Sequence, residues 1–169
     1  MDINDFWING LPQDFDDVEL ALASSSLEEE SAHLALLTAD EAVVYQGLPH
    51  QIRKQDWLAA RLALKTIMAK RGVDPVNVEA RPEESGQPRL YVHGERTQDL
   101  YISLAHEQGM GLAAVCTHPV GCDLEKLNEN NAKIRDKIGS DKEFSLLSVP
   151  STPGHAESIL FSLKESAIK

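Results

Sequence analysis

The chain has 169 residues, of which 42% are apolar, enough for the core of one medium domain or of two small half-domains. No stretch approaches the roughly 18 apolar residues of a membrane span, and the start lacks the basic region of a signal peptide, so we expect a cytoplasmic protein without membrane contact. The net charge of −11 disfavours nucleic-acid binding, because a polyanion would meet no basic surplus.

The acidic charge is concentrated near the N-terminus. Residues 1–50 hold 11 of the 27 acids and no Lys or Arg, which leaves 16 acids against 16 bases in the rest of the chain. We therefore expect an acidic N-terminal segment over 1–37, of which residues 1–31 fit either a loosely packed leader or an edge strand. Cys116 and Cys122 have no Cys or His pair at zinc spacing, so we predict two buried thiols.

Two helices are predicted after this segment. Thr38 and Glu41 form the pattern of a capping box, which predicts a short helix over about 39–46. Apolar residues at helical spacing predict a longer helix over 51–71, with a glycine directly after it as the stop signal.

Beyond residue 75 the pattern becomes that of β-structure, followed by further helices. Short apolar runs separated by turn residues predict strands, and the last three of these are expected to form an antiparallel meander. The predicted strands are 76–79, 90–92, 100–105, 111–116 and 120–125, and the predicted helical regions are 126–148 and 156–169.

Two carboxylates stand two residues apart in the last predicted strand. Asp123 and Glu125 leave the same face of that strand, while Cys122 and Leu124 point the other way. Carboxylate oxygens select Mg²⁺, Mn²⁺ or Ca²⁺ over Zn²⁺, so the pair fits a site for a hard cation. The alternative is a solvated pair of acids at a strand end.

A second charged peptide lies in the final predicted helix. Glu165 and Lys169 are spaced i,i+4 and Lys164 precedes them, a spacing that an ordinary surface ion pair also uses. Taken with Asp123 and Glu125, Glu165 would complete a three-carboxylate cation site, and the two lysines would neutralise phosphate oxygens.

These two peptides resemble the hallmarks of the 4′-phosphopantetheinyl transferases of the surfactin-synthetase-activating type. The family's hydrophobic-Gly-hydrophobic-Asp-hydrophobic-Glu strand is matched by residues 120–125, and its Trp-x-x-Lys-Glu-(Ala/Ser)-x-x-Lys helix by 161–169, with Phe161 in place of Trp. The resemblance covers roughly residues 38–169.

The resemblance implies an α+β fold of two similar α/β halves, with antiparallel sheets and packed helices. The first half is expected over 38–118 and the second, with the metal-site strand and the Lys-Glu helix, over 119–169. Because members of this type continue beyond that helix, the second half is expected to be shortened and incomplete.

The resemblance further implies a magnesium-dependent transfer of 4′-phosphopantetheine from coenzyme A to a serine of an acyl or peptidyl carrier protein. It places Mg²⁺, or Mn²⁺, on Asp123, Glu125 and Glu165, and catalytic roles on Glu143, Glu165 and Lys169. Coenzyme A contacts are inherited by Arg61, Gly86, Gln87, Pro88, Ala105, His106, Lys164 and Lys169.

Other interpretations stay open. Ala105 stands where the family has Ser, and Gln87 replaces a Lys, so one alternative is a degenerate, non-catalytic domain that binds coenzyme A or a carrier protein. A third interpretation is a cation-dependent nucleotide hydrolase that uses the same three carboxylates. Self-association is an alternative way to cover the apolar side of the last helix.

Overall fold

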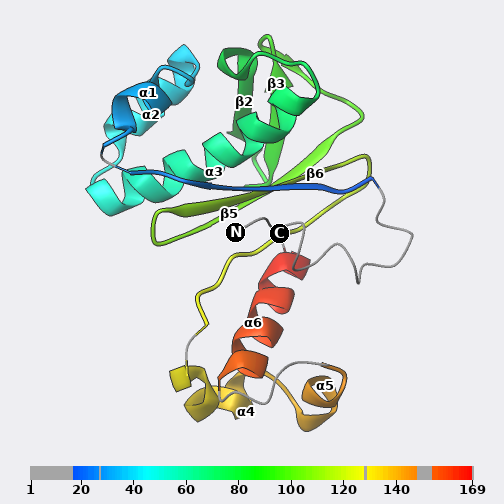
Figure 1. The fold of residues 1–169 in the computed structure, drawn as a ribbon. Helices are drawn as coiled ribbons and strands as arrows, with labels where there is room; N and C mark the ends of the chain where they lie inside the picture. The colour runs from blue at the N-terminus through cyan, green and yellow to red at the C-terminus, as the bar shows by residue number, and fades with distance from the viewer. Residues whose placement is uncertain (1–16, 27, 128, 148–153, 169) are drawn as a thin grey trace.

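A 20-residue helix, α3 (Gln51–Lys70), organises the fold in the computed structural model, which describes residues 17–26, 28–127, 129–147 and 154–168. The helix lies where its apolar periodicity predicts, and Ala63, Leu64 and Ile67 are fully buried against strands. Figure 1 shows it running across the upper body of the molecule. Among the described residues, no helix combines the length and apolarity that crossing a bilayer requires.

The described part of the chain folds into the following helices and strands, in chain order. They are β1 (Glu19–Ser24), α1 (Glu30–Leu34), α2 (Ala39–Gly47), α3, the 3-10 helix η4 (Pro75–Asn77), β2 (Val78–Pro82), β3 (Pro88–Val92), β4 (Glu95–Arg96), β5 (Tyr101–Glu107), β6 (Met110–Cys116), the 3-10 helix η5 (Glu129–Ile134), α4 (Arg135–Ile138), α5 (Asp141–Ser145) and α6 (His155–Ile168).

Two antiparallel sheets of three strands each lie beside α3. One has the order β1-β6-β5 and the other β2-β3-β4. Within the acidic N-terminal segment, the edge-strand reading is confirmed for Glu19–Ser24, because β1 pairs with β6 in the register Glu19↔Val115. Helices beside antiparallel sheets confirm the predicted α+β class.

The pleat of the first sheet separates two apolar layers. Ala113 and Val115 face α3, whereas Ala114 between them belongs to a second cluster with Ala105 and Cys122. The peptide that contains Cys122 therefore covers the sheet face opposite α3.

A buried ion pair ties α2 to α3. Thr38 and Glu41 form the predicted capping box, each side chain bonding to the other residue's backbone N–H. Glu41 also meets Lys65 Nζ at 2.8 Å, and both side chains are 2% exposed. Burial lowers the pKa of Lys65, and Lys65 also donates to the carbonyls of Pro75 and Val78, so all of its donors are used inside the protein.

The prediction of a strand over 120–125 is wrong. The segment has no ladder partner in the structure, since Cys122 N–H donates to the hydroxyl of Ser103 at 3.0 Å rather than to a strand carbonyl. The third strand of this sheet is β1, which pairs with the edge of β6 that does not pair with β5. The predicted meander is therefore a β5–β6 hairpin with a sequence-distant strand at its edge.

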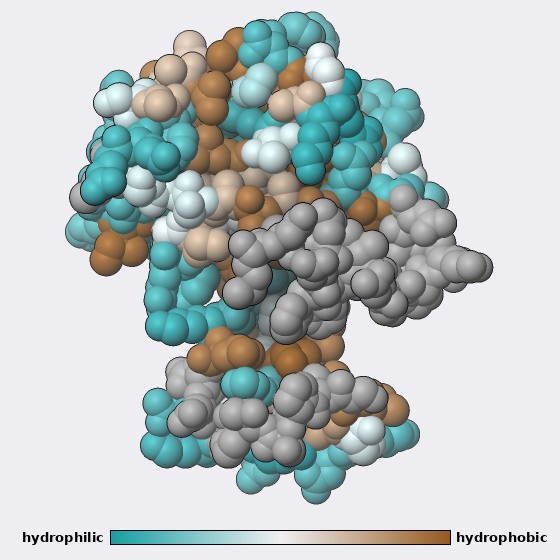
Figure 2. Space-filling view, in the orientation of Figure 1, coloured by the Kyte–Doolittle hydropathy of each residue, from teal (hydrophilic) through white to brown (hydrophobic). Residues whose placement is uncertain are grey.

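The described residues after the 120–125 segment form a small helical lobe. Instead of one long helical region over 126–148, η5, α4 and α5 are short, and they gather at one end of α6 (Figure 1). Ile138, Phe144 and Leu160 form the core of this lobe. Figure 2 shows apolar side chains at the waist between the lobe and the α/β body.

Candidate functional site

The 120–125 segment and the Lys-Glu helix, α6, are in contact at Gly121. A Cβ built at Gly121 would lie 1.8 Å from the carbonyl oxygen of Ser166, so the 120–125 segment touches the α6 backbone at a point where only glycine fits. Ser166 directly follows Glu165. The fold thus places the Asp123 peptide beside the Lys-Glu helix, although 40 residues separate them in sequence.

The three predicted metal ligands lie near this junction, with different environments. Asp123 is half-buried, Glu125 is exposed and Glu165 is half-buried, and Cys122 and Leu124 pack on the sheet. The carboxylate oxygens of the three acids do not all come within 4.8 Å of one another in this structure. The donor set suits a hard cation, and closing the site requires movement of the acid side chains.

Lys164 is held by the helical lobe. Its ammonium lies 2.7 Å from Glu143 Oε1 and donates to the carbonyl of Ile138 at 2.9 Å. Glu143 also caps α5, accepting from the backbone and the hydroxyl of Ser140. Lys164 and these bonds lower the pKa of Glu143 to about 2, so this carboxylate is ionised at neutral pH and holds a proton weakly. Lys169 lies outside the described residues.

A cavity of about 540 Å³ opens between the turn before β3 and the junction of the charged peptides. Gln87 and Pro88 line one side, Gly121 and Ser166 the other. Gly86 has φ +85°, a left-handed conformation that favours glycine and sets the turn. Three segments singled out in the sequence therefore border one cavity.

Arg89 is a lining residue that the sequence analysis missed. Among the described residues that line this cavity, it is the one with a positive charge, and Glu83 lies 3.1 Å from its Nε. Its guanidinium also lies over the ring of Tyr101, 5.6 Å from the centroid. The sequence signal that could have identified Arg89 is its position directly after Gly86, Gln87 and Pro88.

Arg61 lies half-buried beside the second sheet. Its guanidinium stacks on Trp57 at 4.1 Å from the ring centroid, and its Nε has no hydrogen-bond partner among the described residues. Burial lowers the pKa of Arg61 to about 10, opposed by the charges of Glu41 and Glu79, so it stays protonated at neutral pH. A half-buried cation with a spare buried donor, Nε, suits an anionic group.

Ala105 and His106 lie on opposite faces of β5. Ala105 is buried against Cys122, whereas His106 is exposed and its Nδ1 lies 3.9 Å from Asp56 on α3. The described contacts of His106 are thus made with Asp56, and those of Arg61 with Trp57. The structure does not join the two residues through any described contact.

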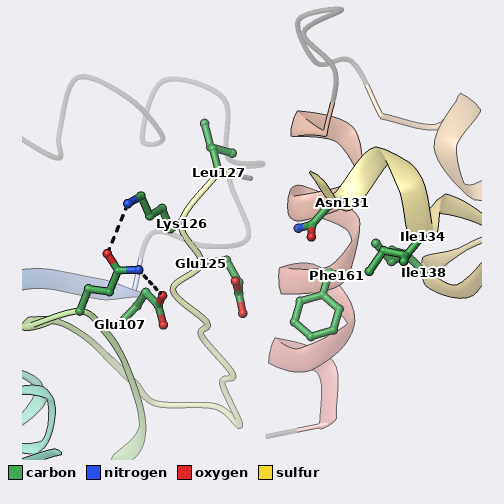
Figure 3. Close-up of a pocket in the computed structure, with 9 residues that line it drawn as sticks. Glu107, Glu125, Lys126, Leu127, Asn131, Ile134, Ile138 and Phe161 are labelled. Atoms are coloured by element: carbon green, nitrogen blue, oxygen red, sulfur yellow. Dashed lines mark hydrogen bonds between the residues drawn. The ribbon is translucent and has the colours of Figure 1, made fainter. Parts of the chain in front are cut away.

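A second cavity, of about 430 Å³, separates the body from the helical lobe. Figure 3 shows Glu107 and Glu125 on the body side and Phe161 on α6 opposite them. Gln108 joins this wall, accepting from Lys126 and donating to Glu107. Glu107 is not among the predicted site residues, although period-two alternation from Ala105 places it on the same sheet face as the 120–125 segment.

Comparisons with known proteins give a consistent result. The chain is 25% identical to the 4′-phosphopantetheinyl transferase of Bacillus subtilis over 147 residues, which cover 85% of this chain and 64% of the relative. It is also 25% identical to the 4′-phosphopantetheinyl transferase gsp of Aneurinibacillus migulanus over 114 residues, 66% of this chain and 46% of that protein. The chain thus spans less than two thirds of each of these relatives.

A crystal structure of a holo-(acyl-carrier-protein) synthase from Bacillus anthracis in complex with CoA (3′,5′-ADP) is also similar, with a TM-score of 0.46 and 21% identity over 59% of this chain and 92% of that one. No protein-family model matches the chain. The sequence similarities nevertheless confirm the resemblance that the motifs predict: the chain is similar to two 4′-phosphopantetheinyl transferases over 85% and 66% of its length.

Proposed function

We propose that the protein transfers the 4′-phosphopantetheine group of coenzyme A to a serine of an acyl or peptidyl carrier protein, with Mg²⁺. The observation that carries the proposal is the cavity of about 540 Å³ bordered by the Gln87-Pro88 turn, Gly121 and Ser166. Peptides far apart in the chain, each matching a piece of the family pattern, meet there. Its volume falls in the range of small-molecule sites, roughly 300–1,000 Å³.

Coenzyme A presents an adenine, a 3′-phosphate and a pyrophosphate to such a site. We assign the adenine to the turn at 86–88 and the phosphates to basic side chains. Arg89 lies on the cavity wall, and Arg61, which does not line the cavity, offers a buried Nε without a hydrogen-bond partner among the described residues. The remaining proposed contacts are Ala105, His106, Lys164 and Lys169, the last outside the described residues.

Asp123, Glu125 and Glu165 are the residues that would hold Mg²⁺, since all three offer oxygen ligands beside the peptide–helix junction. When bound, the cation would neutralise pyrophosphate charge and stabilise the charge that develops during transfer. At least one of the three acids would have to move for all of them to hold one cation, because the three carboxylates are not gathered within 4.8 Å.

The reaction is a phosphoryl-type substitution. The carrier serine oxygen forms a bond to the β-phosphorus, and the bond from that phosphorus to the bridging oxygen breaks. The serine proton passes, directly or through solvent, to the departing phosphate, which leaves as adenosine 3′,5′-bisphosphate. Glu143, with a pKa of about 2, is a weak proton acceptor at neutral pH. We therefore assign Glu143 the positioning of Lys164, which it contacts at 2.7 Å, in preference to direct removal of the serine proton.

The test is a mass-spectrometric transfer assay with purified protein, coenzyme A, Mg²⁺ and an apo carrier protein. We expect the carrier to gain the mass of phosphopantetheine, and we expect EDTA or Asp123→Asn to remove the gain. A carrier that stays unmodified, while a characterised transferase modifies it under the same conditions, contradicts the proposal.

A second candidate is a domain that binds coenzyme A or a carrier protein without turnover. It is favoured by the three carboxylates, which do not all lie within 4.8 Å of one another, and by Ala105, whose methyl is buried against Cys122 and offers no hydroxyl to a phosphate. Isothermal titration with coenzyme A, with and without Mg²⁺, separates the candidates, because binding without transfer supports only the second.

A further inference from the structure

Asp17, Cys116 and His118 bring three metal-ligating side chains together outside the proposed coenzyme A site. One ligand atom from each lies within 4.8 Å of the other two, and this is the one such group of three among the residues that the structure describes. Asp17 Oδ2 lies 3.2 Å from His118 Nδ1 and 3.3 Å from Cys116 Sγ. The thiol is buried and the imidazole is exposed.

The sheet sets this geometry. Cys116 is the last residue of β6, and the register Glu19↔Val115 continues to place Asp17 opposite Thr117. Thr117 donates to Asp17 from its backbone N–H at 3.3 Å and from its hydroxyl, which fixes the carboxylate. The end of β6 supplies Cys116 and His118, and the segment just before β1 supplies Asp17. The three ligands thus converge before any cation binds.

The spacing fits a tetrahedral ion. Zinc–ligand bonds of about 2.3 Å to sulfur and about 2.0–2.2 Å to nitrogen or oxygen put tetrahedral N and O ligands about 3.4 Å apart and S and O about 3.5 Å apart. The observed separations of 3.2 and 3.3 Å are within a few tenths of an ångström of these values. A thiolate and an imidazole select Zn²⁺ or Co²⁺ over Mg²⁺.

We propose that Asp17, Cys116 and His118 form a binding site for a tetrahedral transition-metal ion such as Zn²⁺, with solvent as the fourth ligand. The site is not recognisable in the sequence, because its ligands follow no zinc spacing and Asp17 lies far from Cys116 and His118 along the chain. Pro119, the next residue, lines the cavity of about 540 Å³. A bound ion would therefore anchor the start of the 120–125 segment to β1.

The experiment uses Co²⁺ as a spectroscopic probe on the full chain, because a thiolate ligand gives a charge-transfer absorption and tetrahedral geometry gives intense d–d bands. The Cys122→Ser variant keeps Cys116 as its one thiol. We expect it to retain both features and to lose them when Zn²⁺ is added. The absence of a thiolate band from this variant overturns the proposal.

Ligand removal provides an independent readout. His118 is largely exposed, so His118→Gln is expected to fold normally, as checked by circular dichroism, and to bind Zn²⁺ at least about 10-fold more weakly. His106→Gln, an exposed histidine on the same hairpin, is the matched control and should bind like the native chain. Equal affinity of the native and His118→Gln chains, or loss of Zn²⁺ binding in Asp123→Asn instead, overturns the assignment.

Discussion

Gly121→Ala tests the junction on which the proposed site depends. A Cβ at this position would lie 1.8 Å from the Ser166 carbonyl oxygen, whereas real Cβ contacts are essentially never under 3.0 Å. The segment and α6 must therefore separate by at least the difference, 1.2 Å. The obstacle is helix backbone, which cannot rotate away as a side chain would.

We expect two effects of different size. Overpacking of this kind costs about 1–3 kcal/mol in the free energy of unfolding. Displacement of a reacting group by about 1 Å costs on the order of 100-fold in rate, so the transfer of phosphopantetheine should fall much more than the stability does. Asp123 and Glu165 lie on the two sides of the junction that the methyl group forces apart.

Urea denaturation followed by circular dichroism measures the stability, and the carrier mass assay measures the transfer. Gly47→Ala is the matched control, because no atom lies within 4 Å of its added Cβ and its φ is not positive. That control should be neutral, or more stable by up to about 1 kcal/mol. A Gly121→Ala protein with native stability and a native rate of transfer would refute the close approach.

Three further predictions concern stability. Lys65→Met leaves Glu41 a buried, uncompensated carboxylate, so urea titration should show that the free energy of unfolding falls by about 3–5 kcal/mol. Adding Glu41→Gln should recover part of this loss, and no recovery would contradict the prediction. Lys164 holds the Glu143 pKa at about 2, below its ordinary 4.5, so the pair stabilises the fold at neutral pH and this contribution is lost as the pH falls from about 4.5 toward 2. Lys164→Met should flatten the stability curve in that range, and curves parallel to the native one would rule out the linkage. Gly111→Ala places a Cβ 2.1 Å from the α3 backbone and should cost at least about 3 kcal/mol in thermal or urea melts, whereas a native-like melt would contradict that contact.

Local signals were sufficient where neighbouring residues decide the structure. The capping box at Thr38 and Glu41 fixes the start of α2, and the turn at 84–88 forms around Gly86 because a positive φ is needed there. Such features depend on a few consecutive residues. The sequence therefore predicts them with their boundaries.

Features that depend on distant partners were not predictable in the same way. The 120–125 segment has the composition of a strand, yet β1 occupies the sheet edge it was expected to fill. Nothing local to Glu19–Ser24 specifies pairing with β6. The Asp17, Cys116 and His118 cluster depends on that same pairing, so it too becomes visible only once the strand is placed.

The candidate site divides between two parts of the structure that are held by different contacts. Cys122 anchors the Asp123 peptide to the sheet through Ser103, whereas Lys164 ties α6 to the helical lobe through Glu143. The Gly121–Ser166 contact joins the two parts, so the packing at this contact sets how Asp123 and Glu165 lie relative to each other. Any ligand that bridges these two acids must also fix the lobe against the body, so its affinity includes the free energy of bringing the two parts together.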